Sequence, residues 1–337
     1  MEDLGGACKQ SPYTANQSTA FRITIVDGGT LNPGDLSWDP FCSLGTVELY
    51  DNTTTDQLLP RTKQSTAIIT NKVPLDRGHF EQLKCLRYVG VTATGYDVVD
   101  LRAAREHNVI VTNVPTYSTH SVAQMTFALL LELCHRVGHH DGAVKAGRWS
   151  ESPGFCFWDF PLIELNGLTM GIVGLGQIGS AVANLATAFG MRVIGTVRSA
   201  RSLSTSNIEL VDIATLALEA DVVSLHCPLT PETAGMINLE FLRSMKRTAF
   251  LINTARGALI SYDDLLVALR EGLIARAALD VLEVEPPPRE HPIFTAPNCI
   301  ITPHIAWATK ASRSRLIQIA AANLQAFQQA IPANVVN

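Results

Sequence analysis

Short apolar runs rich in β-branched residues recur along the first third of the chain, separated by stretches with the spacing of amphipathic helices. The runs lie at residues 21–26, 46–50, 67–70, 88–91 and 109–112. The helical stretches include residues 60–64 with their flanks, 77–83 and 99–106. Strands that alternate with helices form parallel sheets through crossover connections. This part of the chain is therefore predicted to be one α/β domain.

A change of pattern follows at residues 121–137, where apolar residues cover most of the circumference of one predicted helix. Such a helix is buried on nearly all sides, either inside its own subunit or partly against a second subunit. An aromatic cluster at residues 155–160 follows in a loop flanked by Pro153 and Pro161. Exposed apolar patches of this kind usually mark interfaces. We therefore expect a homodimer.

The alternation of strands and helices then resumes. A strand at residues 168–173, a glycine-rich loop at 174–179 and an amphipathic helix at 180–189 lead to a second strand at 191–197. Further apolar runs lie at residues 221–226, 249–253, 277–281 and 299–302. These repeated units predict a second, doubly wound domain of the Rossmann type.

The glycine loop has the spacing G-x-G-x-x-G between a predicted strand and a predicted helix, which is typical of dinucleotide-binding sites. Gly174 would make the tight turn, Gly176 would let the backbone approach the pyrophosphate, and Gly179 would let the helix pack on the sheet. The free N–H groups at the helix start, around Gln177 and Ile178, would bind the phosphates. A nicotinamide dinucleotide is the cofactor that this pattern predicts.

An acidic residue that binds the ribose 2′-hydroxyl is expected at the end of the second strand of such a domain. Here the strand runs into Arg198, Ser199 and Arg201 instead. Guanidinium groups pair with phosphate through two parallel hydrogen bonds, so these residues favour a 2′-phosphate and hence NADP(H). If the two arginines are only solvated charges, NAD(H) would serve as well.

Three segments near predicted strand ends hold the groups that hydride transfer to a keto acid requires. Such a reaction needs a cation for the carboxylate and carbonyl, an acid that protonates the developing alkoxide, and a neighbour that tunes this acid. Histidine suits the acid because its pKa lies near neutrality, and an adjacent carboxylate favours its charged form. The segments contain Arg256, Asp280 with Glu285, and His304.

Together these motifs resemble the D-isomer-specific 2-hydroxyacid dehydrogenases, and within them the glycerate dehydrogenase or hydroxypyruvate (glyoxylate) reductase group. The resemblance covers residues 23–337. It rests on the glycine loop, the three segments above, and residues 69–75, 93–96, 117–119 and 155–160.

The resemblance implies a role for each of several residues. Arg256 would bind the substrate carboxylate and orient the carbonyl, and His304, paired with Glu285, would be the proton donor. Asp280 would hold the nicotinamide amide. The backbone of Ala93, Thr94 and Gly95 would bind the substrate carboxylate, and Cys227, Pro228, Thr254 and Ala255 would line the cofactor site.

The same resemblance implies two doubly wound parallel-sheet domains with the active site in the cleft between them. A discontinuous, flavodoxin-like substrate domain would comprise residues 1–117 and 306–337, and the dinucleotide domain residues 118–305. A closing helix at residues 310–331 would return the chain to the substrate domain.

Composition narrows the class of partner. The formal net charge of −5 and the lack of a basic tract argue against nucleic acid, and the apolar runs are too short to cross a membrane. The first 20 residues lack the features of a signal peptide. Seven scattered cysteines without a C-x-x-C pair suggest reduced thiols in a cytoplasmic protein, and no motif predicts a metal.

The expected reaction is therefore reversible NAD(P)H-dependent reduction of a small 2-keto acid to the D-2-hydroxy acid. Two alternatives stay open: a reductase of a larger 2-keto acid in a specialised pathway, and a corepressor-like protein that senses dinucleotides. Glu285 argues against formate dehydrogenase, a relative with glutamine as the partner of the histidine. Val98 stands where the family often has Asn or His, which leaves the substrate side chain open.

Overall fold

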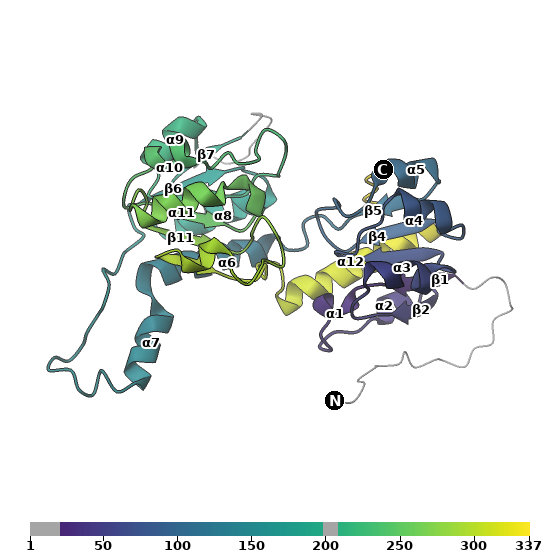
Figure 1. Cartoon of the computed structure of the whole chain (residues 1–337), viewed down its shortest axis with the longest axis horizontal. Coiled ribbons are helices and arrows are strands. Elements are labelled where there is room, and N and C mark those ends of the chain that lie inside the picture. Colours follow the sequence, from purple (N-terminus) through teal and green to yellow (C-terminus); the bar gives the residue numbers. More distant parts are fainter. Residues whose placement is uncertain (1–20, 198–207) are drawn as a thin grey trace. The chain divides into compact units, whose positions relative to one another are not determined.

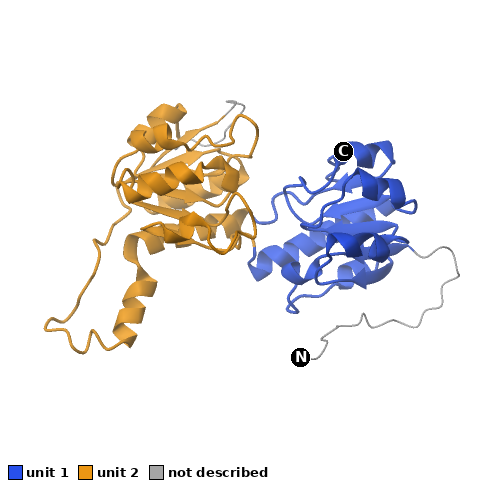
Figure 2. Ribbon diagram, viewed as in Figure 1, with its two compact units in different colours: residues 1–118, 308–337 blue, residues 119–307 orange. Residues whose placement is uncertain are grey.

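The computed structural model describes residues 21–197 and 208–337, and these form two compact units. The first unit comprises Met1–Ser118 together with Ala308–Asn337, of which residues 1–20 are not described. The second unit is Thr119–Trp307 (Figure 2). Each unit has a parallel sheet and helices of its own (Figure 1). The predicted class of two parallel-sheet α/β domains is thereby confirmed.

The first unit contains a five-stranded parallel sheet in the order β2-β1-β3-β4-β5. Its strands are β1 Arg22–Ile25, β2 Thr46–Leu49, β3 Ala67–Thr70, β4 Tyr88–Val91 and β5 Ile110–Thr112. Its helices are α1 Gly28–Leu31, α2 Asp39–Cys42, α3 Thr55–Thr62, α4 Arg77–Gln82, α5 Leu101–Glu106 and α12 Lys310–Gln328. Every residue of β3 and β4 is buried, as expected for strands covered on both faces.

The end of the chain completes this first unit. α12 packs on β4, where the Phe327 ring lies 5.1 Å from that of Tyr88. The residues after α12 then pair with β5 through an antiparallel bridge between Thr112 and Val335. The predicted closing helix is therefore present and is three residues shorter at its C-terminal end.

The second unit contains a seven-stranded parallel sheet in the order β12-β11-β10-β9-β6-β7-β8. Its strands are β6 Thr169–Val173, β7 Arg192–Thr196, β8 Glu209–Leu210, β9 Val222–Leu225, β10 Phe250–Asn253, β11 Arg276–Leu279 and β12 Cys299–Ile301. Its helices are α6 Thr119–His135, α7 Val137–Lys145, α8 Gln177–Ala188, α9 Ile213–Glu219, α10 Leu239–Ser244 and α11 Tyr262–Arg270, with short 3₁₀ turns η1 Gly257–Leu259 and η2 Pro292–Thr295. The strand order reverses between β6 and β9, which is where ligands bind in open parallel sheets.

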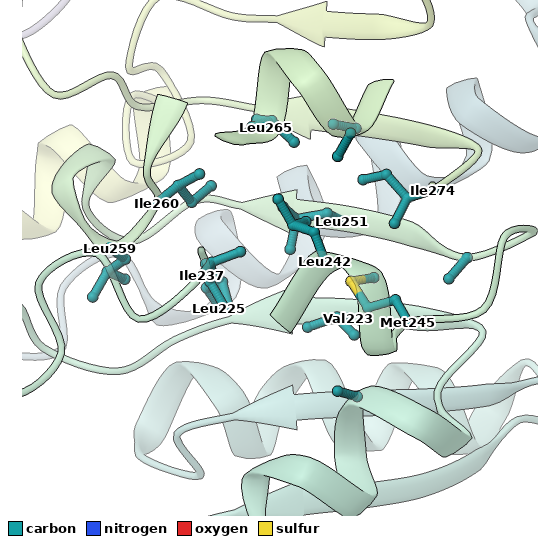
Figure 3. Close-up of a cluster of buried hydrophobic side chains, with 14 of the residues drawn as sticks. Val223, Leu225, Ile237, Leu242, Met245, Leu251, Leu259, Ile260, Leu265 and Ile274 are labelled. Carbon is teal, nitrogen blue, oxygen red and sulfur yellow. The ribbon is translucent and has the colours of Figure 1, made fainter. Parts of the chain in front are cut away.

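Two hydrophobic clusters stabilise this second sheet, one on each face. On one face, side chains of β9 and β10 meet those of α10 and α11, including Leu251, Leu242 and Leu265 (Figure 3). On the other face, α6 packs against α8, and Phe127 stacks on Phe189 with ring centroids 5.1 Å apart. The carboxyl ends of the strands are thus held firmly between two layers of helices.

The apolar helix predicted at residues 121–137 is interrupted near its end. Arg136 adopts the left-handed conformation, with φ 46° and ψ 49°, so α6 ends at His135 and α7 starts anew. α7 contributes no buried residue, and with the following loop it extends away from the sheet of its unit (Figure 1). We call residues 137–162 the arm.

The cysteines depart from one expectation. Cys85, Cys134, Cys156, Cys227 and Cys299 carry free thiols, in line with the predicted reduced state. Cys42 is disulfide-bonded, which corrects that prediction at this position. In the part of the chain that the structure describes, no helix combines the length and hydropathy that a bilayer-spanning segment needs.

Candidate active site and dinucleotide site

The glycine loop joins the end of β6 to the start of α8. Gly174 has a φ of 97°, and a β-carbon there would lie 2.7 Å from the amide nitrogen of Cys227. A β-carbon at Gly179 would lie 2.0 Å from the carbonyl oxygen of Gly174, whereas one at Gly176 would meet no atom within 4 Å. Gly174 and Gly179 therefore permit close packing, and Gly176 faces open space.

That open space adjoins the start of α8, whose N-cap residue is Gly176. Glycine has no side chain that could cap the helix, so the N–H groups at Gln177 and Ile178 stay available for an external acceptor. A helix start of this kind, without a β-carbon in front of it, fits a phosphate. The residues present therefore match the diphosphate of a dinucleotide.

The end of β9 forms a neighbouring wall of this site. Cys227 and Pro228 follow β9, and Cys227 lies against Gly174. His226, just before them, bonds through Nε2 to the hydroxyl of Ser224 at 2.8 Å. Burial lowers the pKa of His226 to about 3, so its ring is neutral at physiological pH. His226 is thus an uncharged part of this wall, bonded to Ser224.

The residues predicted to choose between the two nicotinamide dinucleotides follow β7. Arg198, Ser199 and Arg201 lie outside the described residues, which stop at Val197 and resume at Ile208. The structure therefore places only the strand that leads to them.

Arg256 follows β10 in a loop whose shape is set by a buried amide. The side chain of Asn253 accepts a hydrogen bond from the N–H of Ala255 at 3.0 Å and donates one to the carbonyl of Arg256 at 2.9 Å. Thr254, in the same turn, lies 3.3 Å from the hydroxyl of Thr126 on α6. The Arg256 guanidinium makes one described hydrogen bond, to the Ala255 carbonyl at 2.8 Å, so most of its donors can serve a ligand.

His304 and Glu285 form a close pair. Nδ1 of His304 lies 2.5 Å from Oε2 of Glu285, and the other carboxylate oxygen accepts from the N–H of Leu282 at 2.9 Å. The two side chains are 29% and 31% exposed, so the pair is partly shielded and still accessible to a ligand. A carboxylate on Nδ1 stabilises the imidazolium form and orients the ring.

Asp280 holds the backbone around His304. Its buried carboxylate accepts from the Thr302 hydroxyl at 2.6 Å and from the N–H groups of Ile305 and Ala306 at 3.0 and 2.8 Å. His304 itself has a φ of 54°, a conformation that needs such support. Burial raises the pKa of Asp280, and these donors oppose the rise. Asp280 thus stabilises the turn that contains His304. Its contact with a nicotinamide stays a prediction.

The strand order brings the predicted residues of the second unit to one edge of its sheet. The glycine loop follows β6, Cys227 and Pro228 follow β9, Thr254 to Arg256 follow β10, Asp280 and Glu285 follow β11, and His304 follows β12. Because parallel strands end at the same edge, His304, Glu285 and Arg256 lie in a row with the glycine loop.

The predicted substrate loop lies in the first unit, after β4. Ala93 accepts from the N–H of Val114 at 2.9 Å, and Thr94 accepts from the amide of Asn113 at 2.8 Å and donates to the Val114 carbonyl at 3.2 Å. Within the residues that the structure describes, the N–H groups of Ala93, Thr94 and Gly95 make no hydrogen bond. They are therefore suited to an anion.

Two residues of the site were not singled out from the sequence. Asn253 shapes the Arg256 loop, and Gly257 allows it to touch the loop that carries Glu285, since a β-carbon there would lie 1.9 Å from the carbonyl carbon of Leu282. Asn253 gives a usable signal, because it is a polar residue at the end of an otherwise apolar strand. Gly257 gives none, because its contact is with a distant segment.

Comparison with known proteins gives consistent results. Residues 127–306 match the family model described as D-isomer specific 2-hydroxyacid dehydrogenase, NAD binding domain. The chain is 46% identical over 320 residues to a hydroxypyruvate reductase of Blautia hydrogenotrophica, covering 94% of this chain and 99% of the relative. It is 37% identical to a glycerate dehydrogenase of Methylorubrum extorquens, covering 85% and 90% of the two chains.

Solved structures show the same fold. An acyclic imino acid reductase in complex with NADPH and D-Arg superposes with a TM-score of 0.83 at 29% identity, over 94% of this chain and 100% of the other. A D-isomer specific 2-hydroxyacid dehydrogenase of Lactobacillus delbrueckii ssp. bulgaricus with NAD gives 0.76 at 26% identity, over 94% and 100%. This chain therefore belongs to the D-isomer specific 2-hydroxyacid dehydrogenase family.

Proposed function

We propose that the protein reduces a small 2-keto acid of the hydroxypyruvate or glyoxylate type to the D-2-hydroxy acid, with hydride from a nicotinamide dinucleotide. The pair of His304 and Glu285, at 2.5 Å, is the observation that carries this proposal. It lies on the same sheet edge as Arg256 and the glycine loop, so acid, cation and cofactor site occur together. The names of the relatives support the substrate class.

In this reaction each residue has a defined task. Arg256 binds the substrate carboxylate and polarises the carbonyl, assisted by the N–H groups of Ala93, Thr94 and Gly95. Nδ1 of His304 is bonded to Glu285, which leaves Nε2 to give its proton to the carbonyl oxygen as the alcohol forms. The nicotinamide, when bound, supplies the hydride to the carbonyl carbon. In the oxidation direction Nε2 takes the proton back.

The second unit is proposed as the dinucleotide-binding domain and the first as the substrate-binding domain. Gln177 and Ile178 would hold the diphosphate, and Cys227, Pro228 and the Thr254–Ala255 turn would line the rest of the cofactor site. We propose NADP(H) as the preferred cofactor because Arg198, Ser199 and Arg201 offer donors to a 2′-phosphate.

The arm supports a homodimer. Phe155 is 90% exposed and Trp158 64%, and the arm forms an apolar groove of about 540 Å³ that includes Val137, Val144, Trp149 and Leu162. The conformation of the arm is defined, because Asp159 bonds to His139 and to Arg148, whose guanidinium lies 4.4 Å from the Phe157 ring centroid. Ordered and exposed apolar surface of this extent is typical of an interface, and a second copy of the chain is the partner we propose. The free thiols of five cysteines favour a cytoplasmic location, whereas the disulfide at Cys42 is more typical of an oxidising compartment.

A panel of 2-keto acids assayed with NADPH and NADH tests this function. Hydroxypyruvate and glyoxylate should give the highest kcat/KM, with NADPH ahead of NADH and the D-isomer as the product. Preference for a keto acid with a long side chain would overturn the proposed substrate class. Cofactor binding without turnover of any keto acid would indicate a dinucleotide sensor instead.

A further inference from the structure

The loop that carries Glu285 contains a second pairing of a histidine with a glutamate. Nε2 of His291 lies 2.9 Å from Oε1 of Glu283, two residues before Glu285. The His291 side chain is only 8% exposed, whereas that of Glu283 is 34% exposed. A ring so buried is shielded from substrate, so this pair needs a different explanation from that of His304 and Glu285.

The hydrogen bonds of His291 define its tautomer. Its Nδ1 accepts the N–H of Ile293 at 3.2 Å, at the start of η2, and so carries no proton. The proton of the neutral ring is therefore on Nε2, which donates it to the Glu283 carboxylate. His291 thus acts as a fixed donor that holds an acidic side chain.

Tyr262 holds the same loop at a neighbouring residue. Its hydroxyl donates to the carbonyl of Val281 at 2.8 Å, and its ring packs edge-on against His291 with centroids 5.8 Å apart. Burial and the nearby charge of Glu283 raise the pKa of Tyr262, so its hydroxyl stays protonated and remains a donor. The loop is therefore fixed at Val281 from α11 and at Glu283 from η2.

The position of Glu285 depends on these two attachments. Glu285 accepts the N–H of Leu282, the residue between the two fixed points, while its other oxygen lies against His304. A shift of the loop at Glu283 would therefore move the carboxylate that faces the proton donor. The same shift would reach the Arg256 loop, since a β-carbon at Gly257 would lie only 2.4 Å from the amide nitrogen of Glu283.

We propose that His291 is a positioning residue for the reaction: through Glu283 it holds the loop that places Glu285 against His304. This inference rests on the proposed function and goes beyond it, because the buried His291 bonds to Glu283 and the backbone of Ile293 and is not one of the groups proposed to contact the substrate. Among the described residues, Glu285 bonds to His304 and Asp280 lies close enough to interact with its charge, while Glu283 and Tyr262 contact His291.

The variant H291F keeps an aromatic ring beside Tyr262 and removes the donor to Glu283. We expect kcat to fall by a factor on the order of 10 to 100, as small misplacements of catalytic groups do, with cofactor affinity unchanged. The alkaline limb of the pH profile of kcat should move to lower pH, because a displaced Glu285 supports the imidazolium less. E283Q, whose amide oxygen still accepts from Nε2, should retain most of the activity, whereas E283A should resemble H291F.

Two controls separate positioning from general loss of stability. H79F removes a buried histidine of α4, whose Nδ1 lies 2.7 Å from the exposed carboxylate of the N-cap residue Asp76, and should leave the pH profile in place. H291F added to E285Q should cause little further change in that profile if His291 acts through Glu285. An unchanged pH profile in H291F, or a full additional shift in the double variant, would overturn the proposal.

The tautomer offers a test that needs no variant enzyme to be active. Nitrogen-15 spectra of the wild-type protein, assigned by the signal lost in H291F, should show His291 neutral with its proton on Nε2. A charged ring or a proton on Nδ1 would contradict the proposed hydrogen bond from Nε2 of His291 to Glu283. Failure of the wild-type protein to reduce any keto acid would instead refute the proposed function, with the tautomer result still standing.

Discussion

A β-carbon at Gly257 would lie 1.9 Å from the carbonyl carbon of Leu282, so the loop after β10 and the loop after β11 touch through their backbones. Arg256 precedes this contact in one loop, and Glu285 follows it in the other. The spacing between Arg256 and Glu285 thus depends on a contact that only glycine allows.

Replacing Gly257 with alanine should therefore separate the two loops. We expect kcat/KM for hydroxypyruvate to fall roughly 100-fold, together with a loss of about 1 to 3 kcal/mol in the free energy of unfolding. Steady-state kinetics and urea denaturation measure the two effects. G78A in α4 is a matched control, since its β-carbon would meet only an ordinary contact at 3.4 Å from Asp76. If G257A and G78A had the same kcat/KM and the same free energy of unfolding, the contact between the two loops would not control the site.

Replacing Glu285 with glutamine keeps an acceptor for Nδ1 of His304 and removes the negative charge. Since an adjacent carboxylate favours the charged imidazole, the alkaline limb of the pH profile for reduction should move to lower pH. At a fixed pH above neutrality kcat should fall, while cofactor binding, followed by nucleotide fluorescence, should not change. If the pH profile of E285Q were identical to that of wild type, Glu285 would not be the partner that supports the charged form of His304.

The free energy of unfolding should depend on pH through the protonation of His226. Its folded-state pKa is about 3 against an ordinary 6.5, so the unfolded chain takes up the proton first as the pH falls. Stability from this group is therefore complete above pH 6.5 and is lost progressively toward pH 3, by up to about 1.4 kcal/mol per pH unit. H226Q should lose less stability than wild type between about pH 6.5 and pH 5 in urea denaturation. Parallel curves would show that His226 is not buried as a neutral ring.

A charge introduced into the arm should change the oligomeric state of the protein. Trp158 is 64% exposed and lines the apolar groove, so W158E should place a charge in the proposed interface. Sedimentation should show a dimer for wild type and a monomer for W158E, with similar circular dichroism. The exposed Leu218 on α9 supplies a control, because L218E lies outside the arm and should leave the dimer intact. A monomeric wild-type protein would refute the homodimer.

Much of the architecture could be predicted from the sequence because local pattern and local chemistry agree. The buried strands β3, β4, β9 and β10 are mostly apolar runs. Gly174, Gly176 and Gly179 stand between a strand and a helix, the context in which their spacing predicts a dinucleotide site. The separation of the described residues into two units follows from the same alternation.

The details that escaped prediction depend on contacts between distant segments. Nothing near Gly257 in the sequence indicates Leu282, and nothing near Glu283 indicates that His291 folds back onto it. The break at Arg136 is not predictable from the sequence either, because its neighbours continue the helical pattern and only the left-handed backbone ends α6. Such features arise from tertiary packing between distant segments, which the order of residues along the chain does not show.

The role proposed for His304 is tested by the reduction of hydroxypyruvate by the wild-type protein and by H304A, with NADPH binding measured on both. General acids contribute about 100-fold to 10,000-fold, so H304A should lose at least that lower factor in kcat and still bind NADPH as wild type does. H304A that turns over at near the wild-type rate would contradict the assignment of His304 as the proton donor.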